Sequence, residues 1–177
     1  MDHQPDAEAW LADARSDEAA RSRSRKRWLS QQAAESATLV GALADLADAG
    51  REVVLATRAG SEHRARVAAV GRDVVRLRTD AGTVLVPLTA VTVVHAGPAA
   101  PVPSDDRPPP SAVTLLAALE QLRDDEADVV VRTGDGRSIT GRLEAVGVDV
   151  ATVRSGSAPG ALAYVPLDAL LEVAASG

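Results

Sequence analysis

The stretch VVLATRAGSEHRARVAAVGRDVVRLRT, residues 53–79, is the main sequence evidence for the fold, because a version of it occurs twice in the chain. The second version, VVVRTGDGRSITGRLEAVGVDVATVRS, occupies residues 129–155, at an offset of 76. In both, apolar and polar residues alternate with a period of two between turns that contain glycine, which is typical of short antiparallel strands. Matching ends follow, VPLTAV at 86–91 and VPLDAL at 165–170, now at an offset of 79. The extra residues of the second copy fall in a hairpin, where insertions are tolerated.

The alternation predicts five strands in each copy. In the first copy we expect strands near 52–57, 63–70, 74–79, 83–86 and 91–94. In the second copy we expect them near 128–133, 138–146, 149–154, 161–165 and 170–174. Apolar residues at three- and four-residue steps predict an amphipathic helix before each set, a long one over Trp28–Ala49 and a shorter one over 112–124.

These elements indicate an α+β protein, mainly β with helices, made of two tandem five-stranded barrels, each preceded by an α-helix. The proline-rich sequence at 96–111 favours an extended spacer between them. We therefore expect four segments. They are an acidic then basic N-terminal arm, partly disordered or helical, at 1–27; the first helix and barrel at 28–95; the linker at 96–111; and the second helix and barrel at 112–177.

Composition narrows the classes of function. The chain has 177 residues and no cysteine, which excludes disulfides and cysteine-based metal sites. No apolar run approaches the ~20 residues that span a bilayer, and the acidic start is not that of a secretory signal, so we expect a cytoplasmic protein without membrane contact. The three histidines have no metal-ligand spacing, and no catalytic motif is found. The sequence therefore predicts no enzyme, no cofactor and no metal.

Two groups of cations stand out against the formal charge of -6, which argues against broad attraction to nucleic acid. The run RSRSRKR at 21–27 is a phosphate-binding arm, a solvated face at the start of a helix, or an arm neutralised by the acidic stretch before it. In the first copy, arginines alternate on two neighbouring strands, where they form either a basic patch or a soluble exterior. The candidate nucleic-acid-binding residues are Arg21, Arg23, Arg25, Lys26, Arg27, Arg64, Arg66, Arg76 and Arg78.

Other polar residues have simpler interpretations. Asp73 and Asp149 follow a glycine at equivalent turns, so we expect each carboxylate to cap its own turn by accepting hydrogen bonds from nearby backbone amides. His63 and His95 lie at strand ends and are expected at the surface.

The pattern VVVRTxDGRxIxGxLxxV at 129–146 resembles the first motif of the Sm-like family, which includes the Sm and LSm proteins and Hfq. In such a strand, a glycine like Gly141 allows the sharp bend that closes a small barrel. The resemblance implies RNA binding and assembly through edge strands. The family's uridine-pocket positions fall on Gly71 and Val75 in one copy and on Gly147 and Ala151 in the other, so the usual pocket is missing.

The leading hypothesis is a non-enzymatic binding or scaffold protein that contacts RNA, or a ribonucleoprotein, through the basic arm and the first barrel. The alternative is a protein-interaction adaptor or a self-assembling scaffold that needs no nucleic acid. Such a protein would dock a partner through the Trp28–Ala49 helix or pair its barrel edges with a second copy. The two edges could also close on each other within one chain.

Overall fold

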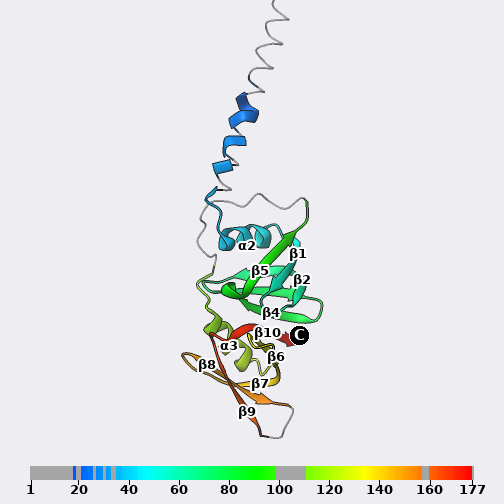
Figure 1. Cartoon of the computed structure of the whole chain (residues 1–177), viewed down its shortest axis with the longest axis vertical. Helices are drawn as coiled ribbons and strands as arrows, with labels where there is room; N and C mark the ends of the chain where they lie inside the picture. The colour runs from blue at the N-terminus through cyan, green and yellow to red at the C-terminus, as the bar shows by residue number, and fades with distance from the viewer. Residues whose placement is uncertain are drawn as a thin grey trace, which may run out of the picture.

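The structure is a computed structural model of the chain and describes residues 18, 21–25, 27–29, 31–32, 35–98, 111–156 and 160–176. Within these residues the protein is mainly antiparallel β with two helices set against the sheet (Figure 1). Most of the predicted linker, residues 99–110, lies outside the described residues.

The first half of the protein, residues 39–96, begins with a helix and continues with strands joined by short turns. Its sequence alternates because one side of each strand faces the core; β1, for example, has buried Val53, Leu55 and Thr57 between more exposed neighbours. The elements are α2 (Leu39–Asp48), β1 (Glu52–Thr57), β2 (Glu62–Val70), β3 (Val74–Thr79), β4 (Gly82–Pro87), the 3-10 turn η1 (Leu88–Ala90) and β5 (Val91–Ala96).

The second half, residues 115–176, repeats this order. Its elements are α3 (Leu115–Asp124), β6 (Asp128–Thr133), β7 (Ser138–Val146), β8 (Val150–Ser155), β9 (Leu162–Pro166) and β10 (Leu170–Ser176). The predicted strands agree with these bounds to within two residues at each end. Thr38 and Thr114 cap the two helices alike, because each hydroxyl oxygen accepts a hydrogen bond from a backbone amide three residues later.

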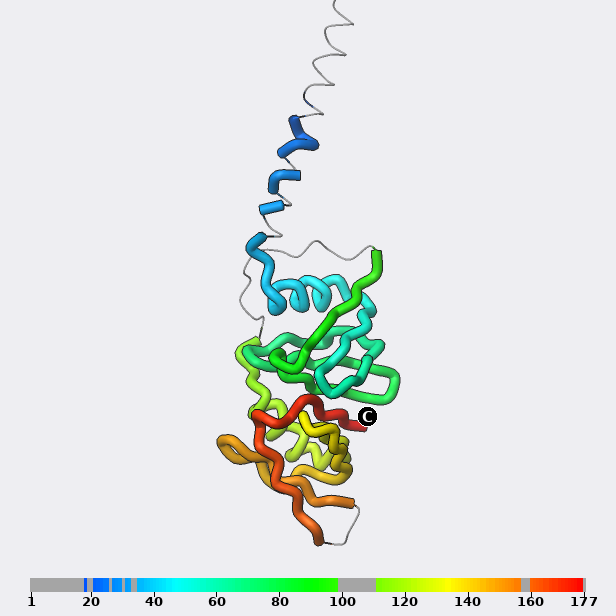
Figure 2. Tube along the Cα trace, viewed as in Figure 1, coloured from blue at the N-terminus to red at the C-terminus, as the bar shows by residue number. Residues whose placement is uncertain are grey.

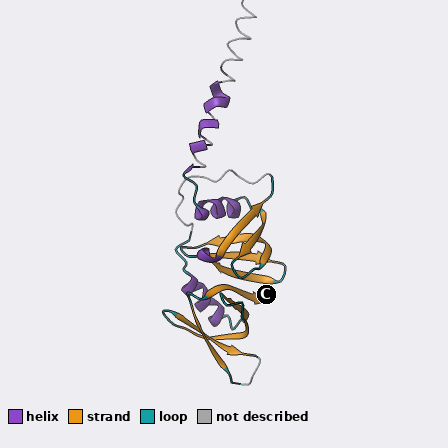
Figure 3. Ribbon diagram, in the orientation of Figure 1, coloured by secondary structure: helices purple, strands orange, loops and turns teal. Residues whose placement is uncertain are grey.

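All ten strands belong to one hydrogen-bonded sheet, in the order β5-β1-β2-β3-β4-β10-β6-β7-β8-β9. The two halves meet where β4 pairs antiparallel with β10, from Leu85 opposite Val173 to Gly82 opposite Ser176. Figure 3 shows this unbroken run of strands from one half into the other. Two tandem barrels were expected, with edge pairing inside the chain as one of the alternatives. An edge strand of each half pairs with the other, so the sheet is continuous.

The strand registers of the two halves match. Leu55 lies opposite Val94 in the first half, and Val131 lies opposite Val173 in the second. Each half also has a bulge in its long strand, between Val67 and Ala69 in β2 and between Leu143 and Ala145 in β7. A bulge bends a strand and increases its twist, which allows nine residues to curve around a small core. These matches make the strand positions of one half comparable with those of the other.

The hydrophobic cores of the two halves interlock. Leu171, on β10, packs into the core of the first half. In return Val74 and Leu85, from the first half, pack into the core of the second. Residues 39–96 and 115–176 therefore share buried surface as well as hydrogen bonds, and their traces lie against each other in Figure 2.

The predicted continuous helix over Trp28–Ala49 is wrong. Described residues between 27 and 35 are helical, but the chain leaves helical geometry at 36–38. Thr38 is extended, with φ -110° and ψ 159°, and its side chain starts α2 as a new helix. A threonine hydroxyl that accepts an amide hydrogen bond favours a helix start over a helix interior, which explains the break.

Candidate functional site

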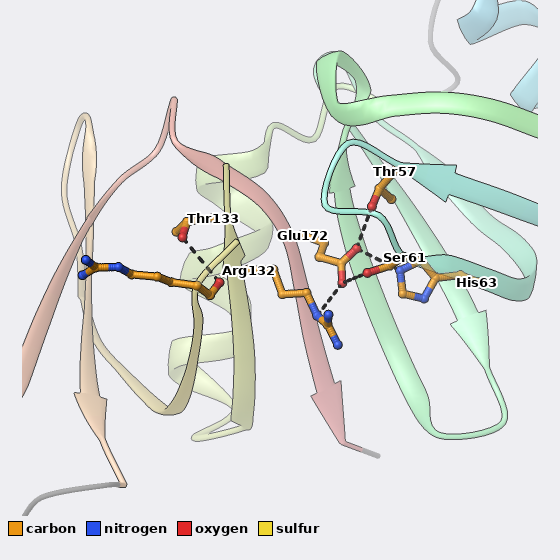
Figure 4. Close-up of polar contacts among 7 residues, drawn as sticks. Thr57, Ser61, His63, Arg132, Thr133 and Glu172 are labelled. Carbon is orange, nitrogen blue, oxygen red and sulfur yellow. Dashed lines mark hydrogen bonds and ion pairs between the residues drawn. The ribbon is translucent and has the colours of Figure 1, made fainter. Parts of the chain in front are cut away.

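A buried carboxylate lies at the junction of the two halves. Glu172, on β10, is only 2% exposed. From the first half it accepts hydrogen bonds from Thr57 Oγ1, Ser61 Oγ and His63 Nε2, each at 3.0 Å. From its own half it receives Arg132 Nε, also at 3.0 Å. Figure 4 shows Glu172 projecting from β10 toward these side chains. Charged groups are seldom buried without such partners, so this cluster fixes the relative position of the halves.

The environment of Glu172 favours its charged form. Burial by itself raises the pKa of a carboxyl group, but hydrogen bonds from His63 and Ser61, with the adjacent imidazole, outweigh it and leave the pKa of Glu172 below its ordinary value. The carboxylate is therefore ionised at neutral pH, which suits a group that accepts three hydrogen bonds and is also paired with a guanidinium group.

A second polar link joins the halves at α3. The carboxylate oxygen Oδ1 of Asp73 accepts a hydrogen bond from the Leu115 amide at 2.7 Å, and the Arg72 amide donates to the Val113 carbonyl at 2.9 Å. The prediction that Asp73 caps its own turn is wrong, because this carboxylate reaches the first turn of a helix 42 residues away. An acid at a helix N-terminus is stabilised by the unpaired amides there.

The cluster around Glu172 was missed by sequence reasoning, and the prediction for His63 is wrong. His63 was expected at the surface, yet its side chain is 16% exposed and bound to Glu172. The available signal was the repeat itself. Glu172 is a lone charge in the apolar strand sequence LLEVAA, and the equivalent residue of the first copy is Val93.

The structure separates the four strand arginines. Arg66 and Arg78 lie opposite each other on β2 and β3, and both are exposed. With Arg64, which is paired to Glu52 at 3.2 Å, they border a hollow of about 330 Å³. Arg76 does not join them, because its guanidinium donates to Gln121 Oε1 on α3 at 2.9 Å. Two acids, Glu52 and Asp80, also line the hollow.

The basic arm is described in part. Arg21, Arg23, Arg25 and Arg27 are exposed and helical, whereas Lys26 lies outside the described residues. The described pieces of this segment extend away from the sheet in Figure 1, so the structure does not bring them next to the strand arginines. Trp28 and Leu29, on the same segment, are 62% and 53% exposed.

The sheet ends in two outer edges, β5 and β9, each of which pairs on one side only within the described residues. Apolar side chains are exposed on both. Val93 on β5 is 45% exposed, and Leu162 and Tyr164 on β9 are 42% and 69% exposed. A groove of about 440 Å³ lies beside β9. It is lined by Thr133, Gly134, Asp135, Arg137, Ile139, Tyr164, Val165, Pro166 and Ala169.

Comparison with known proteins gives a weak likeness to solved structures. No protein-family model matches the chain, and no curated protein has a similar sequence. Among solved structures, the chain is similar to one described as the crystal structure of the pleiotropic translational regulator Hfq. The identity is 20%, the match covers 33% of this chain and 85% of that one, and the TM-score is 0.30. The sites and partners of Hfq do not transfer to this chain at that level.

Two further features are absent from the described part of the chain. It contains no group of three or more histidine, aspartate or glutamate side chains placed to hold a metal ion. No helix within it is long and apolar enough to cross a membrane.

Proposed function

We propose that this protein is a non-enzymatic scaffold, built from two divergent Sm-like barrels, that assembles head to tail by pairing β9 of one copy with β5 of the next. The observation that carries the proposal is the β4–β10 pairing inside the chain. By the repeat, β9 is equivalent to β4, and β5 is equivalent to β10. The chain thus makes this contact once within itself. The two strands that could make it again, β9 and β5, are unpaired at the outer edges of the described sheet.

The repeat also predicts the register of the pairing between chains. Within the chain Leu85 lies opposite Val173, and these positions correspond to Tyr164 and Val94 at an offset of 79. We therefore expect Tyr164 of one copy opposite Val94 of the next, with Ala163 opposite His95. An unpaired, exposed strand edge is a template for such pairing.

Exposed apolar residues support the same geometry. Leu85 is fully buried because the second half covers it, whereas its equivalent Tyr164 is 69% exposed. Arg72, in the turn that meets α3, corresponds to Val148, which is 92% exposed. Leu39, at the start of α2, is 41% exposed and corresponds to the buried Leu115. The surfaces that would meet between chains are thus the ones left apolar and open.

Light scattering over a range of protein concentrations tests the proposal. We expect the molar mass of the full chain to rise with concentration, and Tyr164→Lys to weaken association at least tenfold, because a charge on an edge strand opposes pairing. Thr140→Lys is the control. It adds the same charge at an exposed position of β7, whose equivalent in the first half is already Arg64. A chain that stays monomeric at all concentrations would refute the proposal.

RNA contact through the first half is the second candidate function. The observation in its favour is the side-by-side placement of Arg66 and Arg78, neither of which is ion-paired to a described residue. Their equivalents in the second half, Arg142 and Arg154, are held by carboxylates, at 2.9 Å from Asp128 and 2.7 Å from Glu144. Among the described residues, the adjacent arginines of the first half are therefore the pair without carboxylate partners, which favours contact with an anionic ligand.

Neutralising each arginine pair separates specific contact from general charge. We expect Arg66→Gln with Arg78→Gln to weaken binding of a labelled single-stranded RNA and to reduce the salt slope by about 1.4, since each phosphate contact contributes about 0.7. The matched control, Arg142→Gln with Arg154→Gln, removes the same charge from the second half and should leave the slope unchanged. Fluorescence anisotropy over a series of salt concentrations measures both. Equal effects of the two double variants would count against this site.

A further inference from the structure

The two halves satisfy the same buried hydroxyl in different ways. The turn after β1 and the turn after β6 have the same backbone hydrogen bonds, from Thr57 N to Ser61 O and from Thr133 N to Arg137 O. In the second half, Thr133 Oγ1 donates to Asp135, a residue of the turn itself. In the first half the equivalent of Asp135 is Ala59, so Thr57 Oγ1 donates instead to Glu172, which arrives on β10.

The strand that approaches each turn differs in a complementary way. The position of Glu172 on β10 corresponds to Val93 on β5. Glu172 lies opposite Arg132, whereas Val93 lies opposite Ala56. On the receiving side, His63, which donates to Glu172, corresponds to the apolar Ile139 in the groove beside β9. Strand β10, with the charged Glu172, thus meets the turn that has Ala59. Strand β5 has the apolar Val93 at the same position, which suits the turn that already contains the carboxylate of Asp135.

From this we infer that residues 59 and 135 in the turns and residues 93 and 172 in the incoming strands form a pairing code, which directs β10 to β4 and β5 to β9. The pairing of β5 with β9 between chains rests on the proposed head-to-tail assembly. The pairing of β10 with β4 within the chain does not. Glu172, Asp135 and Val93 are therefore specificity-determining residues of strand pairing.

Each wrong pairing has an identifiable defect. If β10 of another copy approached β9, the Glu172 carboxylate would face the carboxylate of Asp135, which already pairs with Arg137 at 3.0 Å. If β5 approached β4, Val93 would leave Thr57, Ser61 and His63 without their acceptor. Repulsion between like charges and unsatisfied buried donors are the two usual means by which interfaces reject incorrect partners.

A double-mutant cycle within the chain tests the code without any assembly. Ala59→Asp places a second carboxylate beside Glu172 and is expected to lower the melting temperature by about 5 °C or more. In the Glu172→Val background the same change supplies the missing acceptor and should raise the melting temperature. Ala59→Asn, which adds the same volume without charge, is the control for steric effects. An Ala59→Asp effect of the same sign and size in both backgrounds would overturn the inference.

The second arm tests the code between chains, by sedimentation velocity of the full-length protein. Val93→Glu, at a half-exposed position, should weaken association at least tenfold. Adding Asp135→Ala and Ile139→His, which copies Ala59 and His63 of the first half, should restore it. Wild-type association that is unaffected by Val93→Glu contradicts the code alone. A monomeric wild type contradicts the proposed assembly, and the cycle within the chain then decides the code.

Discussion

Gly141→Ala is expected to destabilise the protein by about 4 kcal/mol, a large effect for one methyl group. A Cβ atom built at Gly141 would lie 1.9 Å from the carbonyl oxygen of Arg154 and 2.8 Å from its carbonyl carbon. Both are backbone atoms of the neighbouring strand β8, so no side chain can rotate to make room. Relief requires β7 and β8 to separate, with loss of the hydrogen bonds between them.

Urea unfolding followed by circular dichroism measures this loss. The matched control is Gly134→Ala in the same half, because the nearest atom to its Cβ would be Ala169 O at 3.9 Å. We expect that variant to remain within about 1 kcal/mol of the wild type. A Gly141→Ala variant as stable as the control would show that β7 and β8 do not approach each other as described.

The first half explains why this glycine is not repeated. Its equivalent residue is Ala65, which is buried at 3% exposure. In the second half the ladder between β7 and β8 includes Gly141 opposite Ser155. The corresponding ladder of the first half begins one pair later, with Arg66 opposite Arg78. Because Ala65 has no partner in this ladder, there is room for its methyl group.

The second large effect is expected from Glu172→Ala, at about 3 kcal/mol, since removal of one partner from a buried ionic cluster leaves the others unpaired. His63 and Arg132 would lose their carboxylate, and Thr57 and Ser61 would lose their acceptor. Glu144→Ala is the control. It removes a carboxylate from a more exposed ion pair and should cost no more than about 1 kcal/mol.

The pH dependence of stability identifies the charge as the cause. Because the pKa of Glu172 is lowered in the folded protein, its contribution is fully present above the unfolded pKa, about 4.3. It is lost as the pH falls through the lower folded value. The difference in unfolding free energy between wild type and Glu172→Ala should therefore be constant near neutrality and shrink below about pH 4. A difference that does not change with acid would mean that packing, and not the charge, stabilises the junction.

The strands were predictable because their information is local. Alternation in VVLAT and VVVRT, with glycine turns after them, places β1 and β6 without knowledge of the rest of the chain. The repeat then identifies equivalent positions, and the matched registers of the two halves agree with it. Helix α2 was predicted too long because its apolar periodicity continues through Thr38, whose capping role depends on local geometry.

The junction was not predictable in the same way, because its contacts join distant residues. Nothing near Asp73 indicates that its carboxylate caps α3, and nothing near His63 indicates Glu172, 109 residues away. Arg76 shares its strand and side with Arg78, yet it turns to Gln121 once α3 is packed beside it. These outcomes depend on how the halves meet, and alternation along one strand carries no information about that.

In the proposed assembly, one mode of strand pairing serves both within and between chains. Because the chain has no cysteine, single-cysteine variants test it directly. We predict that Val94→Cys and Tyr164→Cys proteins, mixed and mildly oxidised, form a disulfide-linked heterodimer, since opposed strand positions bring Cβ atoms within bonding range. Each variant alone, and a mixture of His95→Cys with Tyr164→Cys, should cross-link far less. Equal cross-linking in all of these samples, or none in the first mixture, would contradict pairing of β9 with β5 between chains.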